Sequence, residues 1–230
     1  MKVRSVSATG PTAETIADMN DCGVEALIVY CARVSNPENQ KNSATGPSLL
    51  KYCIDYNHWS VFEMVDWTVE IETSRAIAAQ ILRHRSFAFQ EFSQRYSNVN
   101  KLGNYIETPE MRAKHVDGNR QGSGEVIGQK CIGNVCIDHQ VYAAVYNSID
   151  LYQDLIKGGV APECARMVLP LCTKTRLYMK GSIRSWIHYL QVRCDSHAQK
   201  EHMEVADAIK DEFVKNFPCV SEALGWKEIE

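Results

Sequence analysis

The pattern of hydrophobic and polar positions predicts a chain that mixes helices with a few short strands. Apolar and polar residues alternate from Trp67 to Glu72 and again over 173–180, which is typical of half-buried strands, and residues 1–8 indicate another short strand. Apolar residues at helical spacing, bounded by caps, glycines or prolines, predict helices over 21–34, from Pro47, over 74–82 behind Ser74, over 141–156 before Gly158 and Gly159, over 162–170, from Ser182, and from Ser196 to Phe217. Ser196 and Gln199 have the spacing of a capping box for the last of these helices.

Residues 112–137 interrupt this order. They are rich in glycine and polar side chains and show almost no apolar periodicity, so they predict a long, inserted surface loop. No internal repeat or linker divides the chain. We therefore expect one domain over residues 1–230, of the α+β class, with a small antiparallel sheet flanked by helices that include long C-terminal ones.

Composition changes this picture mainly by what it excludes. A net charge of −3 argues against a general affinity for nucleic acid or membranes, so any basic patch must be local. The nine cysteines are irregularly spaced without a CxxC pair, and several lie in apolar runs, which favours a reduced, cytoplasmic setting. The first residues contain no apolar run of a signal peptide, and no stretch has the length of apolar residues that crosses a bilayer.

The first chemical signal is a basic cluster at residues 83–96 of a chain that is acidic overall. It contains Arg83, His84, Arg85 and Arg95, and it begins directly after a predicted helix. The helix dipole stabilises cations near a C-terminus by about 0.3–1 kcal/mol each, which explains one or two of these charges. Arginine forks beside a serine hydroxyl also match the oxygens of a phosphate. Composition alone leaves the two explanations equally open.

Two shorter stretches carry further polar groups. His58, Ser60 and Glu63 lie within six residues and form a candidate polar site, although a surface loop that enters a strand is the more common meaning of such a stretch. Arg166 is a lone arginine in a short apolar helix between two prolines. Such a side chain either extends to solvent or points into a polar pocket.

A fourth stretch lies near the C-terminus. Arg184 and His188 are four residues apart and share a helix face, whereas Arg193 follows nine residues after Arg184 and points to another side. His197 and Glu201 are also four apart. Because no HExxH motif is present, we expect these two to form a solvated pair rather than part of a metal site.

Metal and phosphate-loop chemistry is not indicated elsewhere. Cys131, Cys136 and His139 lack a fourth ligand at zinc-site spacing, so no metal site is predicted. The chain has neither a GxGxxG nor a GxxxxGK[ST] motif. A bound nucleotide or flavin would have to be held by side chains and short helices.

The basic cluster resembles the signature of flavin-dependent thymidylate synthases, in which RHR opens the longer pattern RHRxxSxNExSxRY. The residues in matching places are Arg83, His84, Arg85, Glu91, Ser93, Arg95 and Tyr96. The other stretches are similar to the family's HxSxxE stretch, its ExARxxLP helix and its C-terminal S/N-x-R…R…SHAQxE region, and they occur in the same order. The resemblance extends from about residue 31 to residue 201.

The resemblance implies an enzyme that reductively methylates dUMP to dTMP. 5,10-Methylenetetrahydrofolate would supply the carbon, reduced FAD the hydride, and NADPH would restore the flavin. The family also implies a homotetramer whose active sites combine several subunits, so that arginines far apart in one subunit can converge across an interface. No nucleic acid or membrane partner is implied.

The site residues follow from the resemblance one position at a time. FAD would contact His58, Ser60, Arg83, His84, Arg85, Glu91, Ser182, Ile183, Arg184 and His188. The dUMP pocket would contain Gln80, Ile81, Leu82, Arg83, Glu91, Phe92, Ser93, Gln94, Arg95, Arg166 and Arg193. Arg193 would also be the catalytic residue, because a permanently charged guanidinium stabilises a uracil anion that forms by ionisation at N3. Ser93 is interpreted as a phosphate-binding hydroxyl, since no general base adjoins it as a nucleophile would require.

Four positions depart from the family pattern: Ala88, Gln90, Ser182 and His188. The neighbouring charged residues are kept, so we expect differences in the flavin contacts rather than in the activity.

A different class of function also fits the basic cluster. Aromatic residues are interleaved within this cluster and could stack on bases, as in a nucleotide- or RNA-binding module without catalysis. These residues are Phe87, Phe89, Phe92 and Tyr96.

Overall fold

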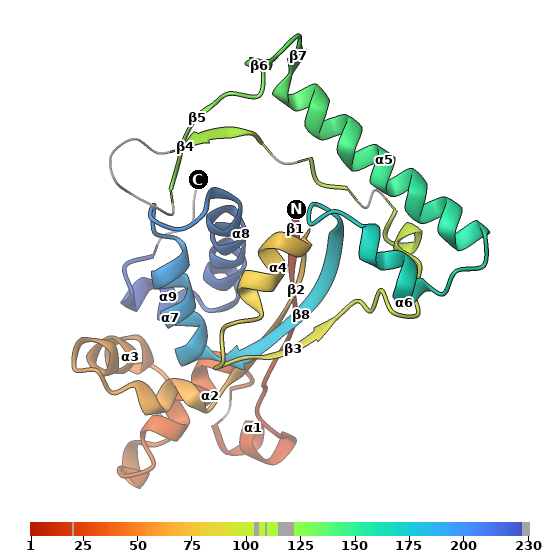
Figure 1. Cartoon of the computed structure of the whole chain (residues 1–230). Coiled ribbons are helices and arrows are strands. Elements are labelled where there is room, and N and C mark those ends of the chain that lie inside the picture. The colour runs from red at the N-terminus through yellow and green to blue at the C-terminus, as the bar shows by residue number, and fades with distance from the viewer. Residues whose placement is uncertain (20, 104–105, 109, 115–121, 227–230) are drawn as a thin grey trace.

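The computed structural model describes residues 1–19, 21–103, 106–108, 110–114 and 122–226 (Figure 1). Its strands are β1 (Lys2–Ala8), β2 (Asp66–Ser74), β3 (Ala88–Glu91), β4 (Arg112–Lys114), β5 (Ser123–Val126), β6 (Cys131–Ile132), β7 (Val135–Cys136) and β8 (Lys174–Ser182). Its α-helices are α1 (Ala13–Met19), α2 (Val24–Ala32), α3 (Gly46–Asp55), α4 (Arg75–Ile81), α5 (Ile137–Lys157), α6 (Pro162–Ala165), α7 (Ile183–Arg193), α8 (Lys200–Asn216) and α9 (Pro218–Ala223). Short 3₁₀ helices cover Pro37–Asn39, Trp59–Glu63, Val99–Leu102 and Arg166–Val168.

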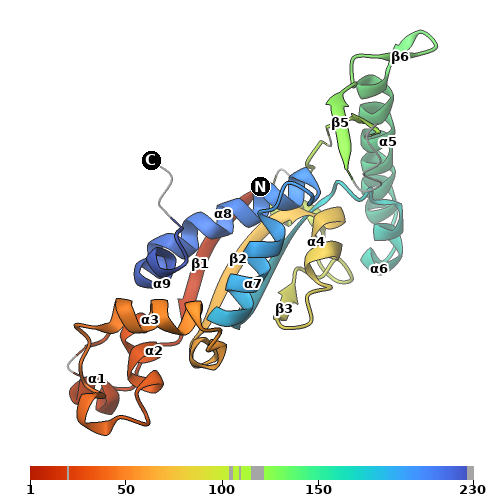
Figure 2. The ribbon, with the colours of Figure 1, turned by 90° about the vertical axis from the view of Figure 1, so that its left-hand side faces the viewer.

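The main sheet has the strand order β1-β2-β8-β3, and every neighbouring pair is antiparallel. Helices α7 and α8 lie together beside this sheet (Figures 1 and 2). The structure therefore confirms the expected mixed class with a small antiparallel sheet flanked by helices. β3 and α9 are elements that the hydrophobic pattern did not predict.

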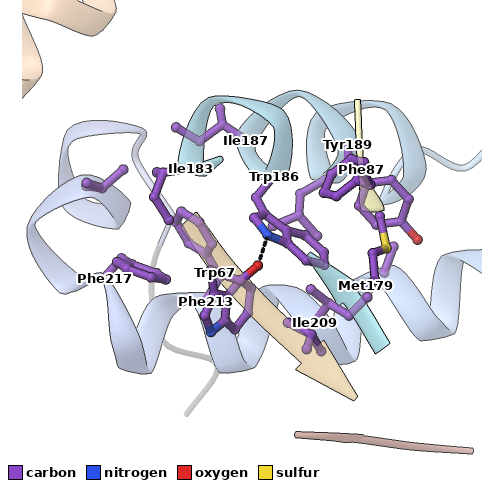
Figure 3. Close-up of a cluster of buried hydrophobic side chains, with 14 of the residues drawn as sticks. Trp67, Phe87, Met179, Ile183, Trp186, Ile187, Tyr189, Ile209, Phe213 and Phe217 are labelled. Carbon is purple, nitrogen blue, oxygen red and sulfur yellow. Dashed lines mark hydrogen bonds between the residues drawn. The ribbon is translucent and has the colours of Figure 1, made fainter. Parts of the chain in front are cut away.

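One face of the sheet forms the main core. Trp67, from the strand predicted by alternation, is fully buried, and Trp186 of α7 packs edge-on against it with ring centroids 4.9 Å apart (Figure 3). The indole N–H of Trp186 donates to the Trp67 carbonyl at 3.0 Å, so this large side chain is buried without an unpaired polar atom. Phe213 and Phe217, from the end of α8 and just beyond it, close the cluster around Trp67.

The other face of the sheet carries charged side chains that pair across strands. Glu70 of β2 accepts hydrogen bonds from Arg4 at 2.9 and 3.1 Å and from Tyr178 at 2.7 Å. Glu72 pairs with Arg176, its neighbour in the register of β2 and β8. The predicted alternation is therefore confirmed, although Glu70 is itself buried because its two partners cover it.

α5 stands away from the sheet and from α7 and α8, and it forms an arm together with the two hairpins before it (Figures 1 and 2). The first hairpin joins this arm to α8, because Arg112 of β4 pairs with Glu201 at 2.6 Å. α5 ends as predicted, with Gly158 as its C-cap and Gly159 at a φ of +86°. Within the described residues, no helix combines the length and the apolarity that crossing a membrane requires.

The prediction of an unstructured loop over 112–137 is wrong for the described part of that stretch. β4 pairs with β5, β6 pairs with β7, and α5 already begins at Ile137. The second hairpin turns through Gly133 at a φ of +65°, a conformation that glycine adopts without steric cost. Residues 115–121 of the predicted loop lie outside the described residues.

The predicted start of the last long helix is also wrong. α8 begins at Lys200 rather than Ser196, and its N-cap Gln199 makes no side-chain capping bond, so the capping box does not form. The carboxylate of Asp195 accepts the backbone N–H of His197 at 2.8 Å. This local bond competes with helix formation and holds the chain in a turn.

Candidate active site

The basic cluster begins where α4 ends. Ser74 caps α4 as predicted, because its hydroxyl accepts the backbone N–H of Ile77 at 3.4 Å. Beyond the helix the chain turns, and Arg83 and Arg85 are exposed there. Phe87 is buried instead, with its ring against Trp186 at a centroid distance of 4.8 Å. The aromatic surface needed by the RNA-binding hypothesis is therefore incomplete, since Phe87 lies in the core.

His84 and Arg193 meet although 109 positions separate them in the sequence. Arg193 donates its Nε–H to Nε2 of His84 at 3.1 Å, and the ring of Tyr189 packs edge-on against the imidazole at 4.9 Å. Burial first, and then the nearby positive charge of Arg193, lower the pKa of His84 to about 4. The imidazole is therefore neutral near pH 7 and can accept this bond, which uses only one of the N–H groups of Arg193.

A second group of predicted residues lines a cavity of about 540 Å³ between the 3₁₀ helix Trp59–Glu63 and α7. Arg184 and His188 share one wall, as their spacing predicts, and Ser86 of the basic cluster contributes another. Arg184 donates to Glu63 at 2.5 Å. The cavity thus joins three stretches that are far apart in the sequence, and its volume lies in the range of ligand sites, about 300–1,000 Å³.

His58 and Ser60 are exposed at the beginning of this 3₁₀ helix. They are not among the residues that line the cavity, whereas Trp59 between them is. The ring of His58 packs edge-on against Tyr52 at a centroid distance of 5.7 Å. Trp59 and Gln191 are lining residues that sequence reasoning missed.

Two of the predicted flavin residues have structural roles of their own. The hydroxyl of Ser182 caps α7 by accepting the backbone N–H of Ser185 at 3.3 Å. The side chain of Ile183 is fully buried in the main core. Any contact of Ile183 with a ligand would therefore have to use its backbone.

Glu91 ends β3 and opens the predicted phosphate loop. Its Oε1 accepts hydrogen bonds from Arg75 at 3.2 Å and from Thr175 at 2.9 Å, so the sheet fixes this carboxylate. The backbone N–H of Phe92 donates to the carbonyl of Arg176 at 2.8 Å and holds the start of the loop against β8.

Beyond Phe92 the loop turns on itself. The hydroxyl of Ser93 accepts the backbone N–H of Arg95 at 3.4 Å. Arg95 and Tyr96 are exposed, whereas Gln94 is buried with 4% of its surface accessible. Nε2 of Gln94 has no hydrogen-bond partner in the described part of the chain.

Arg166 lies where α6 continues into a 3₁₀ helix. The preceding Ala165 is buried in a small cluster with Tyr152 and Val99, and Val99 follows the phosphate loop by only a few residues. This cluster holds the loop and Arg166 on the same part of the molecule. Nε of Arg166 is buried and, among the described residues, has no acceptor. Buried donors of this kind are costly unless a ligand, water or another subunit accepts from them.

Gln80, on the last turn of α4, joins a chain of polar side chains. Its Nε2 donates to Gln199 at 2.6 Å, and its Oε1 lies 3.2 Å from Nδ1 of His202. Next to it, Ile81 is fully buried in the main core, so its side chain is not available to a nucleotide, whereas Leu82 is 37% exposed.

Sequence reasoning placed neither Gln199 nor His202 in the site. The available signal for His202 was its position on the apolar face of α8, where it precedes the buried Val205, Ala206 and Ile209 at helical spacing.

The predicted solvated pair of His197 and Glu201 does not form. His197 bonds to Asp195 at 2.5 Å, and Glu201 accepts from Arg112 at 2.6 Å. The turn at Asp195 takes His197 off the helix, which removes the assumed helical spacing.

The cysteines of the second hairpin face each other. The sulfur atoms of Cys131 and Cys136 lie 3.4 Å apart, and His139 is exposed one turn into α5. Within the described ranges, no three or more histidine, cysteine, aspartate or glutamate side chains are arranged to hold a metal ion.

Comparisons with known proteins agree with the resemblance noted in the sequence. The family model described as thymidylate synthase complementing protein matches residues 17–219. A flavin-dependent thymidylate synthase from Synechocystis sp. is 50% identical over 227 residues, which cover 98% of this chain and 100% of the relative. A probable flavin-dependent thymidylate synthase from Paramecium bursaria Chlorella virus 1 is 44% identical over 234 residues, covering 98% and 100% of the two chains.

Among solved structures, a UMP/dUMP methylase PolB from Streptomyces cacaoi, bound with 5-Br dUMP, superposes with a TM-score of 0.76. The match covers 99% of this chain and 96% of that one at 24% identity, so it supports the fold alone. The family model and both relatives span nearly the whole chain. The chain therefore belongs to the family of flavin-dependent thymidylate synthases.

Proposed function

We propose that the protein is a flavin-dependent thymidylate synthase that converts dUMP to dTMP, with 5,10-methylenetetrahydrofolate as carbon donor, FAD as the flavin and NADPH as reductant. The observation that carries the proposal is the 3.1 Å hydrogen bond from Arg193 to His84. It joins the RHR motif to the arginine that the resemblance assigns to pyrimidine activation. The names of the relatives support the flavin dependence, and the dUMP analogue bound to the similar methylase supports the substrate class.

Arg193 would act by charge and position. Its guanidinium does not lose its proton near neutral pH, so it can stabilise negative charge on a uracil ring without transferring a proton. Neutral His84 accepts the Nε–H of Arg193 and fixes the plane of its guanidinium. The two terminal nitrogens then remain available to donate to the pyrimidine. A protonated His84 would instead repel Arg193 and could not accept this bond.

The phosphate of dUMP would be bound by the loop after β3 together with Arg166. Gln94 and Arg166 each have a buried N–H donor without a partner in the described chain. Exposed Arg95 and the hydroxyl of Ser93 lie on the same loop. Donors of this kind match the acceptor-only oxygens of a phosphate.

The residues around the 540 Å³ cavity fit a flavin nucleotide. Trp59 and Ile187 offer a flat, apolar wall, while Arg184, His188 and Ser86 offer polar groups for the ribose, phosphate or ring heteroatoms. Arg83 and Arg85, exposed at the end of α4, would provide further cations for the diphosphate. When bound, FAD supplies the redox chemistry, and the protein orients the reactants.

The proposal includes a homotetramer with active sites shared between subunits. Arg184 and Arg193 lie nine residues apart on α7, which corresponds to about 14 Å along the helix axis. Arg166 lies on a different part of the chain, next to the arm. Convergence of these cations on one nucleotide and one flavin is therefore simplest across a subunit interface.

The test combines a spectrum with an assay. The purified protein should be yellow, and it should form dTMP from dUMP, methylenetetrahydrofolate and NADPH only when FAD is bound. Arg193→Ala should abolish dTMP formation while the flavin absorbance is kept, because Arg193 touches the pyrimidine rather than the flavin. Lys51→Ala, which removes an exposed cation paired with Asp55 on α3, is the matched control and should keep full activity. A colourless protein without dTMP formation would contradict the proposed function, and full activity in Arg193→Ala would contradict the role of Arg193.

A further inference from the structure

His202 is a fully buried histidine that joins three helices. It lies on α8, where its neighbours on the same face are core residues. Its Nε2 lies 3.0 Å from the hydroxyl of Tyr189 on α7, and its Nδ1 lies 3.2 Å from Oε1 of Gln80 on α4. Position 202 lies outside the stretches that match the family's motifs, and the proposed mechanism does not use the side chain of His202.

His202 belongs to a series of hydrogen-bonded side chains that begins at Arg112, and the direction of each bond follows from that beginning. Glu201 accepts from Arg112 at 2.6 Å, so its carboxylate acts as an acceptor. Gln199 must therefore direct its amide NH₂ to Glu201, at 2.9 Å, which leaves its Oε1 to accept from Nε2 of Gln80 at 2.6 Å. Gln80 consequently presents Oε1 to His202.

The tautomer of His202 follows in the same way. An amide oxygen only accepts, so Nδ1 of His202 carries the proton and donates it to Gln80. Nε2 is then the acceptor for the hydroxyl of Tyr189. Burial, the largest cause, and the charge of Arg193 lower the pKa of His202 to about 4, which agrees with a neutral ring. Every polar atom of the buried imidazole is thus satisfied.

We propose that His202 is a positioning residue for dUMP binding, which acts together with Gln199 to fix the amide of Gln80 so that its NH₂ group faces the nucleotide. This inference rests on the proposed function, in which Gln80 belongs to the dUMP pocket. One hydrogen of that NH₂ group binds Gln199, which leaves the second to donate to an oxygen of the pyrimidine or the ribose. If the amide of Gln80 were turned by 180°, its Oε1 would face the oxygens of the nucleotide, and the repulsion between them would weaken binding.

The chain offers a matched pair of substitutions. In His202→Asn the side-chain amide can take the place of Nδ1 and still donate to Gln80, whereas His202→Gln reaches toward the position of Nε2 and Tyr189. His202→Leu removes both bonds. Tyr189→Phe removes only the bond on the far side of the ring and is the control for a purely structural effect.

The readouts are the Kd of dUMP by calorimetry, KM and kcat for dUMP, the flavin spectrum and the melting temperature. We expect His202→Gln and His202→Leu to raise Kd and KM for dUMP by about 3–10-fold, the range of one lost hydrogen bond, with kcat within about twofold. His202→Asn and Tyr189→Phe should keep Kd and KM within about twofold, although Tyr189→Phe lowers the melting temperature. The flavin spectrum should not change in any of them. In a Gln80→Ala background, His202→Leu should add no further loss of affinity.

Equal KM values for His202→Asn and His202→Gln would overturn the proposal, as would an additive loss in the Gln80→Ala background. Because Asn and Gln are both polar, this comparison decides the matter even if His202→Leu fails to fold. The proposed function fails separately, if the unsubstituted protein binds no dUMP and forms no dTMP. Normal turnover by that protein, with wild-type KM in every His202 variant, contradicts the positioning role alone.

Discussion

Acid should destabilise this protein through His202 in particular. The pKa of His202 falls from 6.5 to about 4 on folding, because the ring is fully buried and faces the charge of Arg193. Between these two values the unfolded chain binds a proton that the folded chain excludes. Stability from this group is therefore fully present above pH 6.5 and is lost as the pH falls toward 4.

The magnitude follows from the two pKa values. Lowering the pH from about 7 to about 5 should reduce the free energy of unfolding by about 2 kcal/mol through His202 alone. The pKa of His84 is lowered in the same direction, but this ring is only half-buried, so we expect a smaller contribution from it. Other titrating groups contribute as well, and they cancel when a variant is compared with the unsubstituted protein under the same conditions.

The assay is urea denaturation at both pH values and at one protein concentration, since an oligomer gains stability with concentration. His202→Asn should lose about 2 kcal/mol less than the unsubstituted protein between pH 7 and pH 5. His139→Asn is the matched control, because His139 is exposed on α5 and its ring contacts solvent in the folded chain as well. If His202→Asn showed the same pH dependence as the unsubstituted protein, the imidazole would not be buried and neutral as the structure places it.

Two further substitutions test the packing around the site. Gly181→Ala should lower the free energy of unfolding by about 1–3 kcal/mol, because a Cβ at this position would lie 2.5 Å from the buried ring of Phe87. Gly10→Ala is the control, since nothing lies within 4 Å of its Cβ and no comparable steric cost is expected. Equal melting temperatures for the two variants would contradict the close approach of Gly181 to Phe87. Glu25→Ala should lower the free energy of unfolding, measured in urea, by about 1–2 kcal/mol. The half-buried carboxylate of Glu25 on α2 accepts the backbone N–H of Val220 at 2.7 Å and so caps α9. An unchanged free energy of unfolding would show that this cap contributes nothing.

The sequence predicted those elements whose burial is periodic. Trp67 and its alternating neighbours behave as expected because repeated contact with the core decides the strand, and Ser74 and Ser182 cap the helices whose apolar faces begin directly after them. The errors occur where a local polar bond or a turn decides instead. Asp195 holds the chain out of α8, and Gly133 closes a hairpin that composition alone suggested was a loop.

The site shows a similar division. Motif spacing predicted the candidate residues, and helical spacing correctly placed Arg184 and His188 on one wall of a cavity. Spacing could not predict the contact of Arg193 with His84, because it depends on how α7 packs against the end of α4 around the ring of Tyr189. Pairings between distant segments are set by this tertiary packing, which a single sequence does not contain.

The same packing explains why a histidine at position 202 has opposite effects on stability and on the site. An apolar side chain would suit the face of α8 that carries Val205 and Ile209, and it would remove the loss of stability in acid. It would also leave Gln80 and Tyr189 without their shared partner, and within the described residues the amide of Gln80 would then be held by its bond to Gln199 alone. A fully satisfied polar group inside a core costs stability under some conditions but specifies one arrangement of its neighbours. In this chain that arrangement extends from the buried core, through Gln80 and Gln199, to the surface where dUMP is proposed to bind.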